Sequence, residues 1–265
     1  MGISSLKNLS ISTGSKSNKF WDQQRTDIIS KDLIAYLNAG NSNSYSGSGT
    51  TWYDLTANGN NFEIFGSPGY QSGTNGYFNF PGAHTVYALR EYMNNFNPQK
   101  FTISFWVYFN GSTRDILLCT SRVGNRSTTT GRASEDANNE SIFSKETTGY
   151  MQYWDYDSGY GFQDVKQTGS PLNSSQWYYL TFSKDVLSGK MYVNGSLTNS
   201  FTSLKDAYIF INDFCIGKDF RDHLTSTSNA ETLDGRLAQF HAYSRALSDS
   251  EVAQNFSIQR SIYGI

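Results

Sequence analysis

The nine residues "FTISFWVYF" (101–109) alternate between two kinds of side chain. Successive side chains of a strand point to opposite faces, so this spacing predicts a strand with one apolar face that belongs in a core. The other face is polar with two large aromatic rings, which indicates a sheet surface that is only partly covered. The apolar face holds Phe101, Ile103, Phe105, Val107 and Phe109, and the other face holds Thr102, Ser104, Trp106 and Tyr108.

The composition of the whole chain agrees with this strand. Of 265 residues, 15% are aromatic and only 17% are charged. Aromatic and β-branched side chains fit a pleated sheet, and the abundant Ser, Thr, Asn and Gly suit polar turns. A helical bundle needs more Leu, Ala, Glu and Lys. The composition therefore predicts an all-β protein.

Further strands and one helix follow from local patterns. Gly189 is expected in the turn of a hairpin between 177–183 and 190–195. In the tail, Ser248 and Glu251 have the spacing of a capping box and predict a helix start. Other strands are expected at 33–37, 208–211, 214–217 and 235–244, with a polar loop at 122–140.

Four segments resemble, in order, the laminin-G-like, concanavalin A-like jelly-roll family. They are "LIAYLNAGNSNSYSGSGTTWYDLTANGNN" (33–61), "FTISFWVYFNG" (101–111), "QWYYLTFSKDVLSGKMYVNGSL" (176–197) and "LDGRLAQFHAYSRALSDSEVAQNF" (233–256). The resemblance implies a two-sheet antiparallel jelly-roll sandwich over residues 32–265, closed by a short C-terminal helix.

Residues 1–31 differ from the rest of the chain, because they are polar and lack a clear period. Phe20 and Trp21 are their isolated aromatic pair. We interpret the segment as an extended N-terminal arm that either attaches the protein to something else through Phe20 and Trp21 or packs along its own domain.

The wording of residues 43–60, "NSYSGSGTTWYDLTANGN", is most similar to jelly rolls of phage and large-virus structural proteins. This resemblance implies a virion protein, made in the host cytoplasm, that displays a lectin-like domain for attachment to host-surface glycans. A purely architectural capsid-decoration, neck or tail subunit is the alternative. Other virion proteins would be its partners, and virion symmetry implies a homo-oligomer.

Charge and hydropathy exclude other partners. The formal net charge is −2 and the sequence has no Lys/Arg run, so it offers no basic patch that would bind nucleic acid. The N-terminus lacks the apolar region of a signal peptide, and no stretch is apolar enough for membrane insertion. Cys119 and Cys215 lie in apolar runs and are expected to be buried free thiols.

Catalytic patterns are missing from the sequence. Glycoside hydrolysis needs two carboxylates on one face, and no two glutamates have a convincing strand spacing. The three histidines are far apart, and no His/Cys cluster suggests zinc. A non-enzymatic protein is therefore expected, and a glycan-degrading enzyme is the alternative that the missing carboxylate pair opposes.

Calcium is a candidate ligand, because oxygen ligands cluster in two turns and the resemblance implies loop calcium sites. The final strand carries Ala238 and Gln239 where the family often has acidic residues, which speaks against a family-type site. The candidate ligands are Asp54, Asn58, Asn60, Asp219 and Asp222.

A candidate carbohydrate platform lies in "YMQYWDYDSGYGF" (150–162). Met151 and Tyr153 suit the core, so the Trp154 side of this strand should face outward, although Asp155 leaves the register open by one residue. Aromatic rings can stack on sugars and carboxylates can accept from hydroxyls. The alternative is that these aromatics bury against a neighbouring strand or chain. The candidate binding residues are Trp154, Tyr156, Asp157 and Tyr160.

Overall fold

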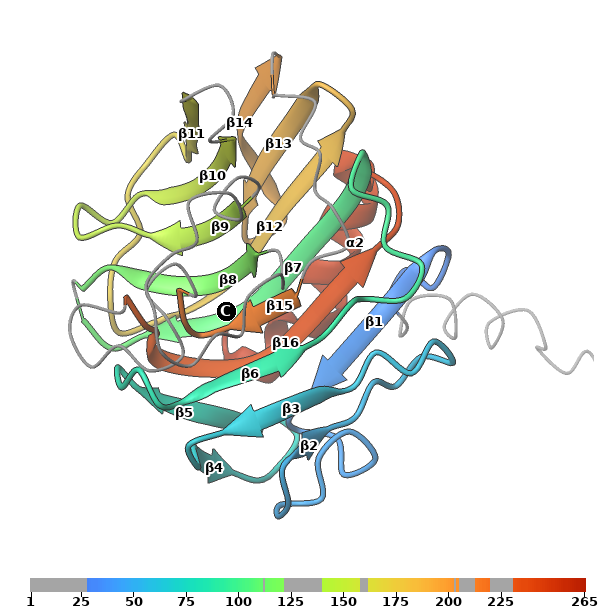
Figure 1. The fold of residues 1–265 in the computed structure, drawn as a ribbon, viewed down its shortest axis with the longest axis vertical. Coiled ribbons are helices and arrows are strands. Elements are labelled where there is room, and N and C mark those ends of the chain that lie inside the picture. Colours follow the sequence, from blue (N-terminus) through green and yellow to red (C-terminus); the bar gives the residue numbers. More distant parts are fainter. Residues whose placement is uncertain are drawn as a thin grey trace, which may run out of the picture.

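The computed structural model describes residues 28–111, 113–121, 140–157, 162–202, 204, 213–219 and 231–265. In these residues two antiparallel β-sheets lie one on the other, and a short C-terminal helix covers the outside of one of them (Figure 1). The predicted all-β jelly-roll sandwich is confirmed. No helix in the described ranges is long and apolar enough to cross a bilayer.

Sheet 1 carries the helix on its outer side, and eight described strands form it. Its order is β14 (Ser196–Thr202), β13 (Ser188–Val193), β12 (Trp177–Asp185), β7 (Lys100–Phe109), β16 (Asp234–Tyr243), β5 (Tyr77–Pro81) and β4 (Gly69–Gln71), and β1 (Leu33–Asn38) also pairs with β16.

Sheet 2 packs against the inner side of sheet 1, again with eight strands among the described residues. Its order is β11 (Phe162–Gln167), β10 (Met151–Asp157), β9 (Glu140–Lys145), β8 (Asp115–Ser121), β15 (Asp213–Ile216), β6 (Tyr87–Arg90), β3 (Phe62–Phe65) and β2 (Thr51–Trp52).

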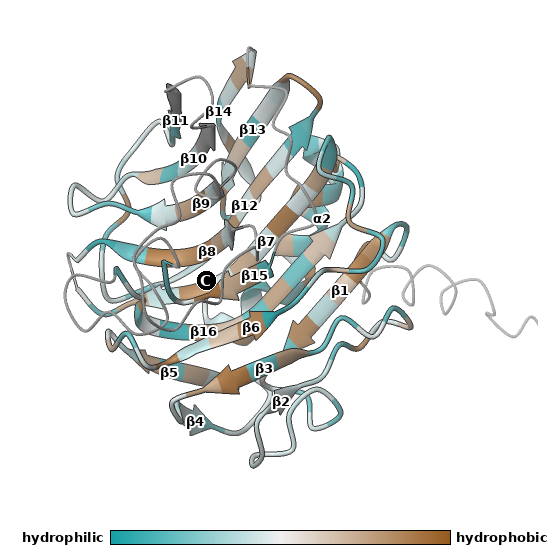
Figure 2. Ribbon diagram, in the orientation of Figure 1, coloured by the Kyte–Doolittle hydropathy of each residue, from teal (hydrophilic) through white to brown (hydrophobic). Residues whose placement is uncertain are grey.

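The main core fills the space between the two sheets. The five apolar side chains of the 101–109 alternation all belong to it, as predicted. Opposite them, Tyr153 of β10 stacks on Phe182 of β12 with ring centroids 3.8 Å apart. Figure 2 shows hydrophobic residues concentrated on the strands. Burying each such side chain stabilises the fold by about 2 kcal/mol, so this face decides which sides of the strands meet.

The second face of β7 is covered as well, which corrects the expectation of a partly covered surface. Trp106 is fully buried beneath the 3-10 helix η2 (Arg260–Tyr263), and its ring stacks on Tyr263 at 4.2 Å. The indole Nε1 donates a 2.7 Å hydrogen bond to Oε1 of Gln259, at the end of helix α2 (Asp249–Gln259). The sequence pattern of β7 is local and contains no sign of this helical lid.

His241 lies in the same covered layer. Its ring nitrogens lie 3.1 Å from Oε1 of Gln239 and 3.4 Å from the Tyr179 hydroxyl. Burial lowers the pKa of His241 to about 3, so the imidazole is neutral inside the fold. This is the satisfied sheet histidine that a lone histidine in a strand suggests.

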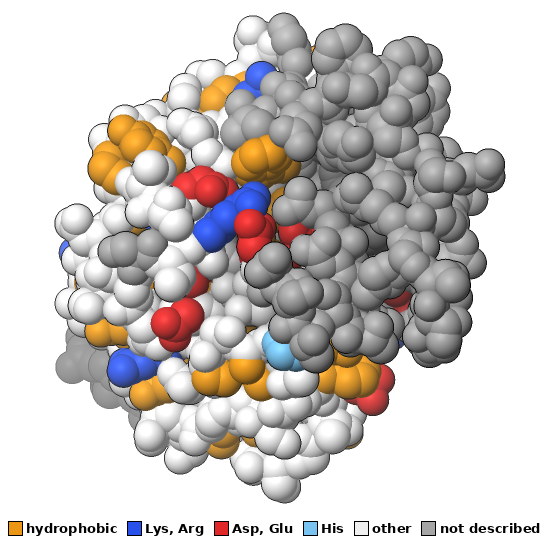
Figure 3. Space-filling model, turned by 60° about the vertical axis from the view of Figure 1, so that its left-hand side comes forward, with side chains coloured by type: hydrophobic (Ala, Val, Ile, Leu, Met, Phe, Trp, Pro, Cys, Tyr) orange, Lys and Arg blue, Asp and Glu red, His pale blue; other side chains and the backbone are white. Residues whose placement is uncertain are grey.

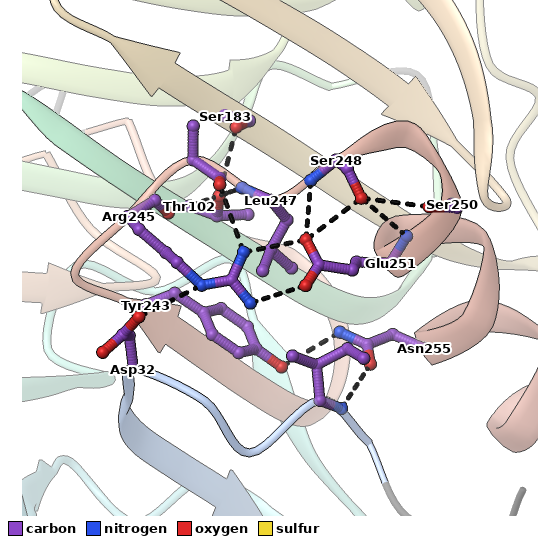
Figure 4. Close-up of polar contacts among 12 residues, drawn as sticks. Asp32, Thr102, Ser183, Tyr243, Arg245, Leu247, Ser248, Ser250, Glu251 and Asn255 are labelled. Atoms are coloured by element: carbon purple, nitrogen blue, oxygen red, sulfur yellow. Dashed lines mark hydrogen bonds and ion pairs between the residues drawn. The ribbon is translucent and has the colours of Figure 1, made fainter.

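Helix α2 starts at the predicted capping box (Figure 4). The Ser248 hydroxyl accepts from the Glu251 N–H, and the Glu251 carboxylate accepts from the Ser248 N–H. Arg245 donates to both oxygens of the same carboxylate at 2.8 and 2.7 Å, and these bonds lower the pKa of Glu251 to about 2. Thr102 accepts from the Leu247 N–H, which ties the helix start to β7.

The hairpin between β12 and β13 differs from its prediction. The turn falls at Val186 and Leu187, and Val186 takes a positive φ of 54°. Gly189 lies inside β13, where an added Cβ would stand 2.6 Å from Leu204. The glycine therefore lets Leu204 pack close to β13 and does not form the turn.

The chain enters the sandwich beside helix α2. The Ile29 N–H donates to Oδ1 of Asn255 at 2.8 Å, and Ser244 donates its N–H to the carbonyl of Asp32 (Figure 4 shows the surrounding contacts). Phe20 and Trp21, the candidate attachment residues, lie outside the described residues, so the arm remains a prediction.

Candidate functional site

Trp154 lies on the outer face of sheet 2, as its strand pattern predicts. Its neighbours Met151 and Tyr153 are buried in the core between the sheets, so the register of β10 is the one expected. The Trp154 ring is half-buried and packs against Ile116, Cys119 and Ile142, which lie on the outer sides of β8 and β9. The ring is thus held on a rigid part of the sheet.

Arg114, the residue just before β8, lies beside this ring. Its guanidinium carbon is 5.3 Å from the centroid of the Trp154 ring, within range of a cation–π interaction. Nε donates to Glu146 at 2.8 Å, and Nη1 donates to Glu231. Ser144 donates its hydroxyl to the same oxygen of Glu146 at 3.3 Å.

These side chains remain partly accessible to solvent. The side chains of Arg114, Glu146 and Glu231 are 20%, 19% and 31% exposed. Figure 3 brings the β8–β10 side of the molecule forward and shows side chains of both charges gathered beside hydrophobic ones. We call Arg114, Ser144, Glu146, Gln152, Trp154 and Glu231 the Arg114 cluster.

Three polar atoms of the cluster are buried without a hydrogen-bond partner in the structure. They are Nη2 of Arg114, Nε1 of Trp154 and Oε1 of Gln152. Gln152 is only 6% exposed, and it points to the same face as Trp154 because the two are two residues apart on one strand. A buried polar atom without a partner costs about 1–3 kcal/mol, so two donors and one acceptor here are sites where a ligand would be favoured.

A buried ion pair holds the strand ends that carry the cluster. Lys145 and Asp115 face each other across β9 and β8 with 2.7 Å between Nζ and Oδ2, and their side chains are 1% and 0% exposed. Lys145 also donates to the Thr113 carbonyl, and Asp115 accepts from the Asp234 N–H. Burial raises the pKa of Asp115, while the hydrogen bond from Lys145 acts in the opposite direction.

Arg114 and Glu146 are neighbours because Asp115 and Lys145 pair in register. The sequence does not show this register, so sequence reasoning did not bring Arg114 and Glu146 together. Glu231 comes from a segment far along the chain, just before β16, and no sequence pattern places it here. Gln152 was recognised only as part of the outward side of its strand.

The other predicted sugar-binding residues are described incompletely. Tyr156 and Asp157 belong to the backbone of β10, but their side chains lie outside the described part of the chain. Tyr160 lies wholly outside it. The predicted platform therefore rests on Trp154 alone within the structure.

The predicted calcium ligands of the first turn are already bonded to protein. The Asp54 carboxylate accepts from the N–H groups of Tyr36, Thr56 and Asn60. Asn58 donates to the Leu33 carbonyl at 3.3 Å. Asp54 thus organises a turn, and calcium binding there remains a prediction.

The remaining candidate ligands do not join that turn. Asn60 is fully buried and exchanges hydrogen bonds with Asn94. Asp219 is buried near the start of β16, with its carboxylate 3.7 Å from the Cys119 sulfur, whereas Asp54 contacts β1. Asp222 lies outside the described residues. No group of three or more His, Cys, Asp or Glu side chains in the described ranges is placed to hold a metal ion.

The fold is a two-sheet antiparallel jelly-roll sandwich. A family model for the concanavalin A-like lectin/glucanases superfamily matches residues 72–253, which is more than half of the chain. The chain therefore belongs to the concanavalin A-like lectin/glucanases superfamily, in its laminin-G group. No curated protein matches the sequence.

Solved structures with the same fold come from carbohydrate-active enzymes and a toxin. Domain 4 of AbnA, an extracellular GH43 arabinanase from Geobacillus stearothermophilus in complex with arabinotriose, is 19% identical with a TM-score of 0.61, covering 84% of this chain and 98% of that chain. The Trypanosoma rangeli sialidase is 16% identical with a TM-score of 0.57, covering 90% of this chain and 34% of that chain. The binding domain of botulinum neurotoxin serotype G is 15% identical with a TM-score of 0.61, covering 86% of this chain and 51% of that chain.

These comparisons overturn the expected function of a virion structural protein that attaches to a host or builds a particle. The three similar structures belong to two glycoside hydrolases and a toxin, and nothing in them links the chain to a virus. The physical reason for the error lies in residues 43–60. Their Ser/Gly-rich and Asn-Gly sequence is typical of tight turns, and any protein with this fold needs such turns.

Proposed function

We propose that the chain is a non-catalytic carbohydrate-binding module whose site is the Arg114 cluster. The observation that carries the proposal is that Arg114, Gln152 and Trp154, on the side of sheet 2 that holds the half-buried indole ring, each have a buried polar atom without a hydrogen-bond partner. Sugar hydroxyls both donate and accept, and a sugar ring offers an apolar face to an aromatic side chain. The cluster supplies both kinds of contact.

The similar structures support this class of ligand. The arabinanase domain, which this chain covers almost completely, was solved with arabinotriose. Short arabino-oligosaccharides are therefore the first compounds to test, beside a broad panel of neutral glycans. The three polar atoms have almost no contact with solvent. A sugar can therefore bond to them only after the side chains that cover them have moved.

The two glutamates of the cluster support binding more than hydrolysis. Glycoside hydrolysis uses one protonated and one ionised carboxyl group. Glu146 and Glu231 both bond to the same guanidinium. Both carboxylates are therefore already engaged by a protein cation, and we expect them to position Arg114 and not to act on a substrate.

The test is titration calorimetry of the purified chain with arabinotriose and with glycans that give signals on an array. We expect Trp154→Ala to weaken binding about tenfold, because a ring contact of about 1 kcal/mol and one hydrogen bond are lost. Tyr53→Ala is the matched control, since Tyr53 is 51% exposed in the loop after β2.

A second variant separates binding from folding. Gln152→Leu removes the buried unpartnered oxygen and keeps the bulk of the side chain, so Tm should stay equal or rise while affinity falls. Absence of binding by the folded protein across the panel, or unchanged affinity in both variants, would contradict the proposal.

A further inference from the structure

We infer that Arg236 and the side chains in line with it on the outer face of sheet 1 form a second binding site, for a saccharide that carries a carboxylate or sulfate group. The site lies on a different sheet from the Arg114 cluster, so the inference goes beyond the proposed function and does not depend on it. It follows from an arginine that contacts aromatic rings and no protein anion.

Strand register places the side chains of this site. Trp177, Tyr108, Arg236 and Asn79 are successive cross-strand partners on β12, β7, β16 and β5. Each has a neighbour in its own strand that belongs to the main core, so all four point to the outer face of sheet 1. Tyr77 lies two residues before Asn79 and shares this face. We call these five residues the Arg236 row.

The helical lid on sheet 1 leaves the row half-open. Trp106 is fully buried under η2, whereas Tyr108, two residues further along β7, is half-buried like the other members of the row. Trp177 contacts the edge of the lid, with its ring centroid 4.9 Å from that of Tyr263. A ligand can therefore reach the row from solvent beside η2.

Two aromatic rings hold the guanidinium of Arg236. Its carbon lies 4.5 Å from the centroid of the Tyr108 ring and 5.0 Å from that of Tyr77, within range of cation–π interactions. Trp177 makes edge contacts with both tyrosines at centroid distances of 5.8 and 5.9 Å. Stacking uses the flat faces of a guanidinium, and the N–H groups at its edge stay available as donors.

No protein acceptor uses these donors. The guanidinium of Arg245 donates to a carboxylate of helix α2, but Arg236 forms no hydrogen bond and no ion pair within the described part of the chain. In the same ranges the hydroxyls of Tyr77 and Tyr108 and Nε1 of Trp177 are also unbonded, and all of these atoms remain in contact with solvent. The row thus offers a fixed positive charge and several donors.

The acidic residue on the same strand does not neutralise this charge by contact. Asp234, two residues before Arg236, accepts from Nδ2 of Asn110 at 2.8 Å and forms no ion pair with Arg236 in the described structure. A guanidinium can give two parallel N–H bonds to a carboxylate or to a tetrahedral oxyanion. Because the two tyrosine rings displace water from its faces, an anion gains more from this charge than it would in bulk water.

The shape and position of the row favour a saccharide as the anion's carrier. The row crosses four strands that are about 4.8 Å apart, so it is about 14 Å long and suits an elongated ligand. Aromatic rings contact the apolar faces of sugars, and the amide of Asn79 can both donate to and accept from hydroxyls. A peptide strand would pair with the edge of a sheet, whereas the row lies on a sheet face.

The test is an array of uronate, sialylated and sulfated oligosaccharides beside their carboxyl-reduced or desulfated counterparts, followed by titration calorimetry of the best pair. The wild-type chain should bind the acidic member about tenfold more tightly, because the neutral member lacks the charge-assisted bonds. Arg236→Gln should lose this preference. Arg236→Lys should keep part of it, since the charge remains and the paired bonds are lost. Added NaCl should weaken binding of the acidic member more than of the neutral one.

Arg260→Gln is the matched control. It makes the same change in net charge, and the Arg260 guanidinium also lies over a ring, 5.3 Å from the centroid of Phe256, outside the row. Thermal unfolding shows whether each variant is folded. Should Arg236→Gln not fold, Tyr108→Phe removes only a hydroxyl and should still weaken binding of the acidic member by a smaller factor; unchanged binding would then contradict the inference.

Equal binding of both members by the wild-type chain, or an unchanged preference in Arg236→Gln, would overturn the inference. So would binding of poly-glutamate as tight as that of the acidic saccharides. A preference that falls in Trp154→Ala and not in Arg236→Gln would place the acidic ligand in the Arg114 cluster, so that the proposed function stands without this inference. A preference that depends on Arg236 in a chain that binds no neutral glycan would support this inference alone.

Discussion

The guanidinium carbon of Arg114 stands 5.3 Å from the centre of the Trp154 ring, and the two residues come from separate segments of sheet 2. Arg114 precedes β8 and Trp154 lies in β10, with β9 between these strands. The contact therefore exists only because the three strands are paired in this order. It joins an aromatic ring, which the sequence singled out, to a charge that the sequence did not.

Arg114→Ala should abolish glycan binding with a small effect on stability. The substitution leaves Glu146 and Glu231 facing each other without a shared cation and removes the contact with Trp154. Partly exposed ion pairs contribute about 1 kcal/mol or less, so the free energy of unfolding should change little. Urea denaturation and calorimetric binding measure the two effects.

Lys100→Ala is the matched control for that substitution, because its ion pair with Asp185 is about half exposed and lies in the other sheet. A loss of binding in the control as large as in Arg114→Ala would show that general charge, and not the cluster, controls affinity.

Lys145→Met should destabilise the fold by about 3–5 kcal/mol, because it leaves the Asp115 carboxylate buried without its cation. Lys145→Met/Asp115→Asn should recover part of this loss, since the amide oxygen can still accept from the Asp234 N–H. Denaturant unfolding of the two variants measures the difference. A double variant no more stable than Lys145→Met would show that the charge is not the cause.

Stability should fall on mild acidification because of His241. Its folded pKa of about 3 lies below the unfolded value of 6.5, so the unfolded chain takes up a proton first as the pH falls. This contribution is fully present above pH 6.5 and is lost progressively as the pH falls toward 3. Between pH 7.5 and 5 the expected loss is about 2 kcal/mol.

Urea unfolding at several pH values measures this slope, and His241→Gln should flatten it because the amide does not titrate. An identical slope in the variant would assign the pH dependence to other groups.

Ser248→Ala should cost about 1 kcal/mol, since it removes the hydroxyl that accepts from the Glu251 N–H at the helix start. Ser257→Ala is the control, because Ser257 is exposed within the same helix and alanine has the higher helix propensity. Thermal unfolding should show a lower Tm for the first variant only. Equal Tm values would mean that Arg245 holds the helix start without the serine.

The sequence by itself determined the elements whose signals are local. The alternation of 101–109 predicted β7 and its core face, and the spacing of Ser248 and Glu251 predicted the helix start. The outward side of 150–156 followed from Met151 and Tyr153. These features depend on residues within a few positions of one another, and their periods follow directly from strand and helix geometry.

Only the tertiary structure decided which distant residues meet. Trp106 is covered by a helix from the C-terminal part of the chain. The Asp54 carboxylate accepts hydrogen bonds from the backbone of β1 and of its own turn. Glu231 reaches Arg114 from the segment before β16. The sheet order sets such contacts, and strand periodicity gives the face of a side chain but not its neighbour across the sheet. The candidate site is therefore a property of the strand order, and within the described residues the sequence showed only its aromatic ring.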